Sequence, residues 1–357
     1  TKLVAVSVET YKQEIIEVLQ RAGEPVKIED ETTFVRLGEG RGMTSSLWTV
    51  DIGGRKYAAK ISNAEGKSNE ECYAQQHNNE LQVYEWLEKL RTDALTSPYD
   101  DDLKTVRFYG GTKCEITKPG LILMADLSSE SVHSSTDVSL STIFSIIDGV
   151  AAYQSAYLST EEELELFPRD MFFELGSTWL KEYIGMTEKQ GWFKEKWRDA
   201  LNAWSDVHSL SAGTYEQEEG DLPLTLAHSD MWMNNILFSK KENYEELELL
   251  AFVDWQAATV GNALTDVVVV VGLNMDASER RKHEREILQH YVDEMKKRCH
   301  RFKKEFPIDA MEKLLPQYRR SLRFAALMLL IFIQSEAGGE SGTYTKRFIG
   351  LLEDIVG

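Results

Sequence analysis

The chain has few cysteines, and none of them shows the spacing of a disulfide scaffold or a metal site. Among 357 residues there are only three, Cys72, Cys114 and Cys299. A small, odd number of scattered thiols fits a reducing compartment, so we expect a cytoplasmic protein. The first residues also lack a signal-peptide pattern, and the threonine at the start suggests that the natural terminus is trimmed here.

Long apolar runs and basic charge are also scarce. The most apolar stretch, 324–333, has ten residues. A membrane-spanning helix needs about 20, so we expect a buried helix there and no membrane insertion. The 59 acidic residues outnumber the 40 basic ones, which gives a formal net charge of −19. This balance disfavours nucleic acid and anionic membranes as partners. It suits a cationic substrate, although solubility alone explains it equally well.

The chain does contain a predicted hairpin with polar residues at one end. Apolar runs at 236–238 and 247–253 flank a polar turn at 239–246, which predicts two antiparallel strands. Asn235 enters the first strand and Asp254 follows the second, so both are expected at the same end of the pair. An amide oxygen and a carboxylate that converge there would suit Mg²⁺, with phosphate oxygens completing its shell.

Asp230 precedes Asn235 by five residues, on the loop that leads to the same end of the hairpin. A phosphotransferase needs one carboxylate for the attacking hydroxyl group and two oxygen ligands for the metal. His228-x-Asp230, four residues and Asn235, with a later Asp254, follows the catalytic-loop and metal pattern of kinases. The alternative is that Asp230 and Asn235 are ordinary turn residues and that Asp254 merely ends a strand.

A glycine-rich turn lies near the N-terminus, between two strand-like runs. Its glycines, Gly40 and Gly42 among them, would let backbone N–H groups approach a phosphate closely, and Ser45 can add a hydroxyl donor. Strands are predicted over 47–52 and 55–61, joined by the two-residue hairpin signal Gly53-Gly54.

Lys60 lies near the end of the second of these strands. Its position is similar to that of the strand lysine that binds the α- and β-phosphates in kinases. Taken alone, Lys60 could equally be a solvated strand lysine. The order of the parts favours the first interpretation, because a glycine turn, a hairpin, a lysine, a helix and a His-x-Asp loop follow one another.

The amino-acid sequences of two segments resemble the motifs of one known family. His228-Ser-Asp-Met-Trp-Met-Asn-Asn235 and Val253-Asp-Trp-Gln256 are similar to the choline-kinase-like, ecdysteroid-kinase-like branch of the aminoglycoside phosphotransferase superfamily. That branch usually has glycine where this chain has Ser229. The resemblance covers nearly the whole chain, which has no repeats, low-complexity tract or linker. It implies an α+β, protein-kinase-like fold with two lobes and a nucleotide in the cleft between them. The small β-rich nucleotide-binding lobe would span 1–125, and the helical catalytic and substrate-binding lobe 126–357.

The resemblance also assigns residues upstream of the catalytic loop. The family's His-Asn-x-Glu element appears as His77-Asn-Asn-Glu80, within a helix predicted over 69–90. Glu80 is therefore the candidate carboxylate for Lys60. The competing choices are Glu71, Glu85 and Glu88, and the plain alternative is a solvated helix face.

A short buried strand is predicted at 121–124. By resemblance, the residues after it form the hinge, where backbone groups of Ala125 and Leu127 would bind adenine. The family commonly has glutamate where Ala125 stands, but recognition through the main chain does not depend on that side chain.

Several other residues receive structural interpretations or two open ones. His228 is expected to support the catalytic loop rather than act as a base, and Asp266 to cap a helix or brace a loop. The mainly helical block 140–210 contains several tryptophans that could line a substrate pocket, even a cage for a quaternary ammonium group, or form helix core. They are Trp179, Trp192, Trp197 and Trp204.

These features predict an ATP- and Mg²⁺-dependent kinase that phosphorylates a hydroxyl group of a small-molecule alcohol. Choline, ethanolamine, a steroid or a sugar-like alcohol would all fit the superfamily. Asp230 would orient or deprotonate the hydroxyl group, and Asn235 and Asp254 would hold Mg²⁺. No Asp-Phe-Gly or Ala-Pro-Glu segment follows Asp254, which argues against a protein kinase. The alternative is a catalytically silent nucleotide-binding homologue with a regulatory role; a purely structural module would not require this set of parts.

Overall fold

The chain divides into two compact units. The computed structural model describes residues 8–37, 45–67, 69–92, 103–133, 138–159, 167, 173–206, 222–239, 247–308, 311–334, 336 and 339–357. The first unit holds the described residues of Thr1–Asp101, Thr105–Ser131 and Ala251–Gln256, and the second those of Asp102–Lys104, Val132–Leu250 and Ala257–Gly357. Within the described ranges, no helix is long and apolar enough to cross a membrane.

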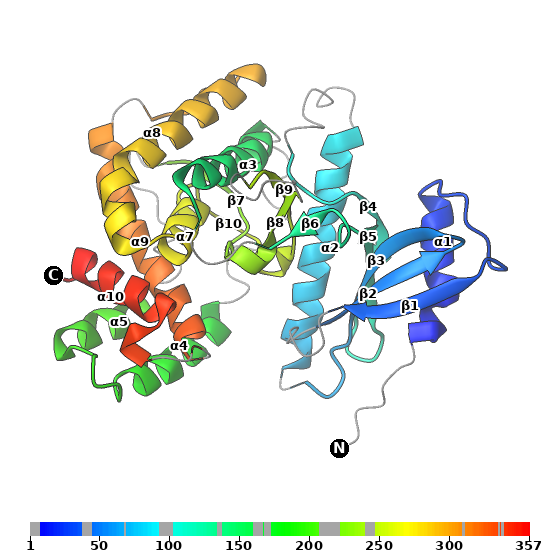
Figure 1. Ribbon diagram of the computed structural model, residues 1–357, viewed down its shortest axis with the longest axis horizontal. Coiled ribbons are helices and arrows are strands. Elements are labelled where there is room, and N and C mark those ends of the chain that lie inside the picture. The colour runs from blue at the N-terminus through cyan, green and yellow to red at the C-terminus, as the bar shows by residue number, and fades with distance from the viewer. Residues whose placement is uncertain are drawn as a thin grey trace. The chain divides into compact units, whose positions relative to one another are not determined.

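The first unit is built on a five-stranded antiparallel sheet with the order β1-β2-β3-β5-β4 (Figure 1). Its strands are β1 (Thr32–Leu37), β2 (Ser45–Ile52), β3 (Arg55–Ser62), β4 (Phe108–Thr112) and β5 (Gly120–Ala125). Its helices are η1 (Val8–Tyr11), α1 (Lys12–Arg21) and α2 (Glu70–Thr92). The strands expected over 47–52, 55–61 and 121–124 are confirmed, as is the helix expected over 69–90, which continues for two more residues.

The turn between β2 and β3 is the predicted glycine hairpin. Gly53 and Gly54 have φ angles of 57° and 84°. Positive φ at both central residues is typical of the tight turns that match the twist of antiparallel strands, and glycine adopts it without steric cost. The Asp51 carboxylate accepts a hydrogen bond from the Gly54 N–H at 2.9 Å. The turn therefore fixes the register that places Leu47 opposite Lys60.

The two faces of this sheet have different partners. Tyr57, Ala59 and Ile61 of β3 lie in a buried apolar core with side chains of α1, such as Ile15 and Leu19. Because side chains alternate along a strand, Lys60 points to the opposite face. Helix α2 packs against β3, β4 and β5, and it supplies Glu80, one of the two carboxylate partners of Lys60 described below. The alternation of side chains along β3 therefore places Lys60 on the face covered by α2 rather than on the face covered by α1.

The second unit is mainly helical. Its helices are α3 (Leu140–Ser159), α4 (Phe173–Thr187), η4 (Glu195–Trp197), α5 (Arg198–Trp204), η5 (Met233–Asn235), α7 (Thr265–Asn274), α8 (Ala277–Arg301), α9 (Met311–Ile333), η7 (Gly339–Ser341) and α10 (Thr343–Ile355). Its sheet residues belong to β7 (Leu224–Ala227), which pairs with β10 (Thr259–Asn262), and to a three-stranded sheet of β6 (Ser131–Val132), β8 (Ile236–Ser239) and β9 (Leu249–Phe252). The predicted hairpin is confirmed as β8 and β9, with Ser239 N–H donating to the Glu248 carbonyl at 2.9 Å. After β9 the chain enters η6 (Trp255–Ala257).

The core of the second unit surrounds α7, whose residues are all buried. Gly272 allows α9 to approach closely, since a Cβ atom at this position would lie 2.6 Å from the Cβ of Ala325. The apolar segment 324–333 forms the C-terminal part of α9, and five of its residues belong to the buried core: Ala325, Ala326, Leu327, Leu329 and Leu330. The prediction of a buried helix there is confirmed.

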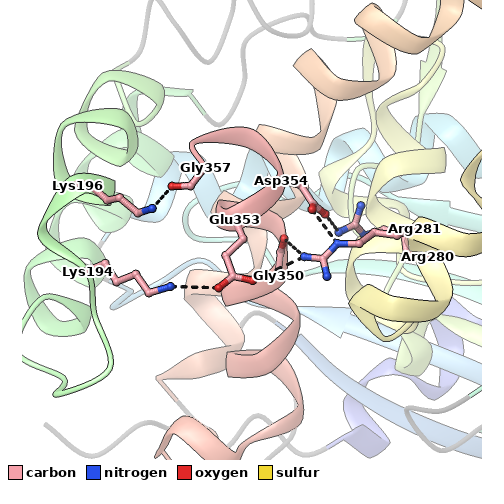
Figure 2. A network of polar contacts seen from close by, with 8 residues as sticks. All are labelled: Lys194, Lys196, Arg280, Arg281, Gly350, Glu353, Asp354 and Gly357. Carbon is pink, nitrogen blue, oxygen red and sulfur yellow. Dashed lines mark hydrogen bonds and ion pairs between the residues drawn. The ribbon is translucent and has the colours of Figure 1, made fainter.

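A polar network fastens α10 to its neighbours (Figure 2). Arg281 donates to Asp354 at 2.7 Å and to the Gly350 carbonyl at 3.1 Å, and the buried Arg280 binds the same carboxylate. On the other side of α10, Lys194 Nζ lies 3.1 Å from Glu353 Oε1. Exposed ion pairs of this kind contribute about 0.2–1 kcal/mol each, so the buried Arg280 is the member whose loss would cost most.

Candidate active site

Lys60 forms the centre of a charged cluster in the first unit. Its Nζ donates to Glu80 Oε2 at 2.5 Å and to Asp254 Oδ1 at 2.7 Å. Lys60 and Glu80 are 8% and 1% exposed, whereas the Asp254 side chain is 33% exposed. The three groups come from β3, from α2 and from the segment after β9. The structure thus shows the Lys60–Glu80 contact, while phosphate binding by Lys60 stays a prediction.

The charges in this cluster perturb one another strongly. Burial alone would lower the pKa of Lys60, but the attraction of Asp254 and Glu80 raises it above its ordinary value. Burial raises the pKa of Glu80 to about 7, because the attraction of Lys60 only partly offsets it and Asp254 adds repulsion. Lys60 is therefore protonated at neutral pH. With both carboxylates ionised, the cluster carries excess negative charge, which favours the approach of a cation.

Asp254 has a backbone conformation that few residues adopt. Its φ angle is 67°, in the left-handed region. Such conformations cost about 1 kcal/mol or more and persist where neighbouring contacts enforce them. The next residue, Trp255, is fully buried, and the Gln256 carbonyl accepts a hydrogen bond from Asn79 of α2 at 3.2 Å. These contacts hold the turn that directs Asp254 toward Lys60.

The segment after β5, which was expected to be the hinge, is braced by its own side chain. The Asp126 carboxylate accepts hydrogen bonds from the Thr49 hydroxyl at 2.7 Å and from the Ser128 N–H at 2.8 Å. Burial would raise the pKa of Asp126, but these two hydrogen bonds outweigh it and lower the pKa. The Ala125 N–H donates to the Arg107 carbonyl at 2.9 Å. A ligand at Ala125 would therefore meet its carbonyl oxygen rather than its N–H.

The glycine turn is the part of the prediction on which the structure is silent. Gly40 and Gly42 lie outside the described residues. Ser45 begins β2 and pairs in register with Ser62 at the end of β3. Two residues before Ser62 on β3, Lys60 faces α2.

In the second unit, Asp230 and Asn235 are brought together. Asn235 Nδ2 donates to Asp230 Oδ2 and to the Asp230 carbonyl, both at 2.9 Å. Asn235 is buried at the end of η5, directly before β8. Both hydrogen bonds use the amide nitrogen, so Oδ1 is the atom that Asn235 can offer to a cation.

Asp266 braces the loop that carries Asp230. Its carboxylate accepts hydrogen bonds from the N–H groups of His228 and Ser229, both at 2.8 Å, and from the Tyr153 hydroxyl. The residue at the N-cap of α7 is Leu264. Of the two interpretations left open by the sequence, the loop brace is therefore confirmed. Burial raises the pKa of Asp266 even though the hydrogen bonds from the Tyr153 hydroxyl and from the N–H groups of Ser229 and His228 lower it.

His228 contacts the same loop from inside. It is fully buried, and its Nδ1 accepts a hydrogen bond from the Asp230 N–H at 3.3 Å. This contact agrees with the structural role expected for His228. Ser229, between them, has a φ of 66°, in the left-handed region that glycine adopts without steric cost.

Comparison with known proteins places the chain in a family. The family model described as "Uncharacterized oxidoreductase dhs-27" (DUF1679) matches residues 52–347. The chain belongs to the DUF1679 family. No curated protein matches it significantly.

Solved structures show the fold of this DUF1679 member. The crystal structure of a putative aminoglycoside phosphotransferase from Ralstonia eutropha JMP134 is 13% identical, with a TM-score of 0.56, over 98% of this chain and 96% of its own. The GDP complex of wild-type aminoglycoside 2′-phosphotransferase-IIIa is 14% identical over 98% of both chains, with a TM-score of 0.48. A microcompartment-associated aminopropanol kinase is 11% identical over 98% of this chain and 95% of its own, with a TM-score of 0.46. The first of these, with the β-rich first unit and the helical second unit, confirms the α+β, kinase-like fold.

The tryptophans of the helical block in this DUF1679 member do not share one environment. Trp197 is fully buried, and the half-buried Trp192 packs edge-on against Phe348, so both belong to the core. Trp179 is 38% exposed.

The sequence interpretation did not single out two residues near Asp230. The ring of Trp232 lies 4.9 Å from that of Phe332, and the buried Asn274 donates to the Met231 carbonyl at 2.9 Å. An asparagine that ends a run of valines and leucine was the available signal for the second contact.

Proposed function

We propose that this protein is an ATP- and Mg²⁺-dependent kinase that transfers the γ-phosphoryl group to a hydroxyl group of a small molecule. The observation that carries the proposal is the buried lysine held between two carboxylates from separate chain segments, Lys60 with Glu80 and Asp254. A buried ion cluster is a weak source of stability, and strongly perturbed titrating groups are typical of functional sites. The fold shared with a phosphotransferase supports the same reaction.

In this proposal the nucleotide is bound by residues of the first unit. Lys60, oriented by Glu80, would bind the α- and β-phosphates, and Gly40, Gly42 and Ser45 would supply further donors. The carbonyl of Ala125 and the backbone of Leu127 would bind the adenine ring.

Asp230 would orient the attacking hydroxyl group and accept its proton. The hydrogen bond from Asn235 Nδ2 to Asp230 Oδ2 fixes the orientation of the Asp230 carboxylate. Oxygen atoms of Asn235 and Asp254 suit Mg²⁺, because this ion is typically held by one or two carboxylates together with phosphate oxygens and water. Among the described residues there is no cluster of three or more His, Cys, Asp or Glu side chains for a metal. The ion would therefore need the nucleotide to complete its shell. When bound, Mg²⁺ would neutralise the negative charge of the transferred phosphoryl group.

The acceptor is proposed to be a small alcohol bound by residues of the second unit, in the block 140–210 and near Asp230. The sequences of the two motifs support the choline-kinase-like, ecdysteroid-kinase-like branch of the aminoglycoside phosphotransferase superfamily, and choline, ethanolamine, a steroid or a sugar-like alcohol would all fit that superfamily. Three buried free thiols, Cys72, Cys114 and Cys299, support a reducing compartment such as the cytoplasm.

Two other activities are distinguishable from this one. A catalytically silent nucleotide-binding homologue would keep the Lys60 cluster but transfer no phosphate. The family description mentions an oxidoreductase, but the chain contains no G-x-G-x-x-G dinucleotide motif. The sheet of the first unit is also antiparallel rather than the parallel sheet of dinucleotide-binding folds.

The test is a screen of phosphate transfer from ATP and Mg²⁺ over a library of metabolite alcohols, with Asp230→Asn as the control. Phosphorylation of one alcohol class by the wild type alone supports the proposal. Nucleotide binding without transfer to any alcohol supports the silent homologue. Oxidation of NADH or NADPH without nucleotide triphosphate binding would overturn the kinase assignment.

A further inference from the structure

Four consecutive side chains of α2 each contact a different part of the first unit. They are His77, Asn78, Asn79 and Glu80, and all but Asn78 are buried. Successive residues on a helix are separated by about 100° and 1.5 Å, so four adjacent polar contacts require chain segments on several sides of the helix. This arrangement fixes the rotation and the axial position of α2 at the level of Glu80.

His77 joins α2 to two strands of the sheet. Its Nδ1 lies 2.9 Å from the Ser62 hydroxyl at the end of β3, and its Nε2 lies 2.9 Å from the Thr112 carbonyl at the end of β4. A carbonyl only accepts, so Nε2 carries the proton. Burial lowers the pKa of His77 to about 4, against the hydrogen bond to Thr112, and the charge of Lys60 lowers it further. The imidazole is therefore neutral, and Nδ1 accepts the hydrogen bond from Ser62.

The neighbouring asparagines extend this attachment. Asn78 Nδ2 donates to the Cys114 carbonyl at 3.0 Å, and Asn78 Oδ1 accepts from the Cys114 N–H at 2.8 Å. Asn79 donates to the Gln256 carbonyl, two residues after Asp254. Asn78 thus binds the connection between β4 and β5, and Asn79 binds the segment that carries Asp254.

The space around His77 is closed by Gly120, the first residue of β5. A Cβ atom at this position would lie 2.3 Å from His77 Nε2, 2.6 Å from Cδ2 and 2.8 Å from the Cβ of Cys114. No side chain fits there unless the imidazole and Cys114 move, because real Cβ atoms do not approach this closely. An alanine at position 120 is therefore a way to displace His77, together with Cys114, without changing either residue.

We propose that His77 is a positioning residue, which, by joining α2 to the ends of β3 and β4, sets the level at which Glu80 meets Lys60. The proposal rests on the proposed function only for its consequence, the correct placement of Lys60 for ATP phosphates. His77 precedes Glu80 by three residues, about 4.5 Å along the helix axis. A displacement of α2 by one residue would rotate Glu80 by about 100° and separate its carboxylate from Lys60 Nζ.

The first test needs no ligand. The carboxyl ¹³C signal of Glu80, identified by its loss in Glu80→Gln, is titrated in the wild type and in His77→Ala, His77→Gln and Gly120→Ala. We expect the Glu80 midpoint to shift by about one pH unit or more in His77→Ala and Gly120→Ala, since its pairing with Lys60 and its burial both change. In His77→Gln the shift is expected to be smaller, because the amide can replace Nε2 as donor to Thr112. His290→Gln, a change to a half-buried histidine on α8 in the second unit, is the matched control and should leave the midpoint unchanged.

An unchanged Glu80 midpoint in His77→Ala, together with reduced thermal stability, would show that His77 only stabilises the fold and would overturn the proposal. If His77→Ala does not fold, Gly120→Ala and Ser62→Ala decide in the same way, because each disturbs one contact of the intact imidazole.

The second test measures kcat and KM for ATP with an acceptor found by the screen. We expect kcat/KM for ATP to fall about tenfold in His77→Ala, equivalent to about 1.4 kcal/mol, and to recover partly in His77→Gln. A wild type that neither binds ATP nor transfers phosphate would refute the proposed function alone, since the ligand-free titration still decides whether His77 positions Glu80. A normal kcat/KM for ATP in a folded His77→Ala protein would overturn the positioning role.

Discussion

The candidate residues of the first unit and those of the second unit are held by different kinds of interaction. In the first unit, Lys60, Glu80 and Asp254 meet through ion pairs between side chains. In the second unit, Asp266 holds the Asp230 loop through the backbone N–H groups of His228 and Ser229. One region thus depends on charges that can find other partners, and the other on hydrogen bonds to the main chain.

This difference predicts different behaviour on ligand binding. A polyphosphate and a cation both offer Lys60 and Asp254 new partners, so the charged cluster is expected to rearrange when they arrive. The buried Asp266 carboxylate accepts hydrogen bonds from two backbone N–H groups, and neither a polyphosphate nor a cation offers those N–H groups a partner in its place. We therefore expect the Asp230 loop to have the same conformation before and after binding, as preorganised catalytic groups require.

The largest expected effect is the loss of phosphoryl transfer in a variant that leaves the charged cluster around Lys60 intact. Asp230→Asn should lower turnover by about 10²–10⁴-fold, because a carboxylate that accepts the proton of the attacking hydroxyl group contributes about that much. ATP binding should survive, since Lys60 and Glu80 are unchanged. Single-turnover phosphate transfer and ATP titration calorimetry measure the two quantities. Near-normal transfer by Asp230→Asn would falsify the role assigned to Asp230.

The second prediction uses pH to separate two opposing contributions in the charged cluster. The pKa of Glu80 is raised from 4.5 to about 7, so its contribution to stability is present below pH 4.5 and is lost as the pH rises through about 7. The pKa of His77 is lowered from 6.5 to about 4, so its contribution is present above pH 6.5 and is lost as the pH falls through about 4. Each amounts to about 3 kcal/mol, from about 1.4 kcal/mol per pKa unit.

Because the two slopes have opposite signs, they should largely cancel between pH 4.5 and 6.5 in the wild type. Relative to the wild type, the free energy of unfolding should have a more positive pH slope in this window in Glu80→Gln and a more negative one in His77→Gln. Urea unfolding at several pH values measures both. Parallel pH profiles for the two variants would contradict the opposite pKa shifts of Glu80 and His77.

The charged cluster was more accessible to sequence analysis than the braced loop. Glu80 could be chosen because a four-residue motif places it on a helix that follows the lysine strand, and the Gly53-Gly54 turn fixes that strand. The positive φ angles of Asp254 and Ser229 carry no sequence signal of their own. The partners of His77 and Asn79 also could not be read from spacing, because they depend on how α2 packs against segments up to 177 residues away in the chain.

The third prediction tests the braced loop directly. Asp266→Asn keeps the size of the side chain but leaves only one oxygen to accept from His228 and Ser229. We expect the free energy of unfolding to fall by about 1.5–3 kcal/mol, the range for hydrogen bonds to a charged group. Asp293→Asn, at an exposed position of α8 whose carboxylate accepts from Gln289 at the surface, is the matched control, with an expected change of about 0.5 kcal/mol or less. A loss at Asp266 no larger than that at Asp293 would mean that the loop is held by other contacts.

The smallest expected effect concerns the backbone of the same loop. Ser229 and Lys303 both have positive φ, 66° and 59°, and a side chain there costs about 1–2 kcal/mol. Glycine removes this cost but loses about 0.5–1 kcal/mol through the greater freedom of the unfolded chain. Ser229→Gly should therefore raise the free energy of unfolding by about 0.5 kcal/mol, since the N–H that donates to Asp266 remains. Lys303→Gly, at the turn after α8, should raise the free energy of unfolding by a similar amount. It measures the contribution of the backbone conformation alone. A gain at position 303 with a loss at position 229 would show that the serine side chain itself stabilises the loop. The loop would then depend on side chains more than its hydrogen bonds to Asp266 indicate.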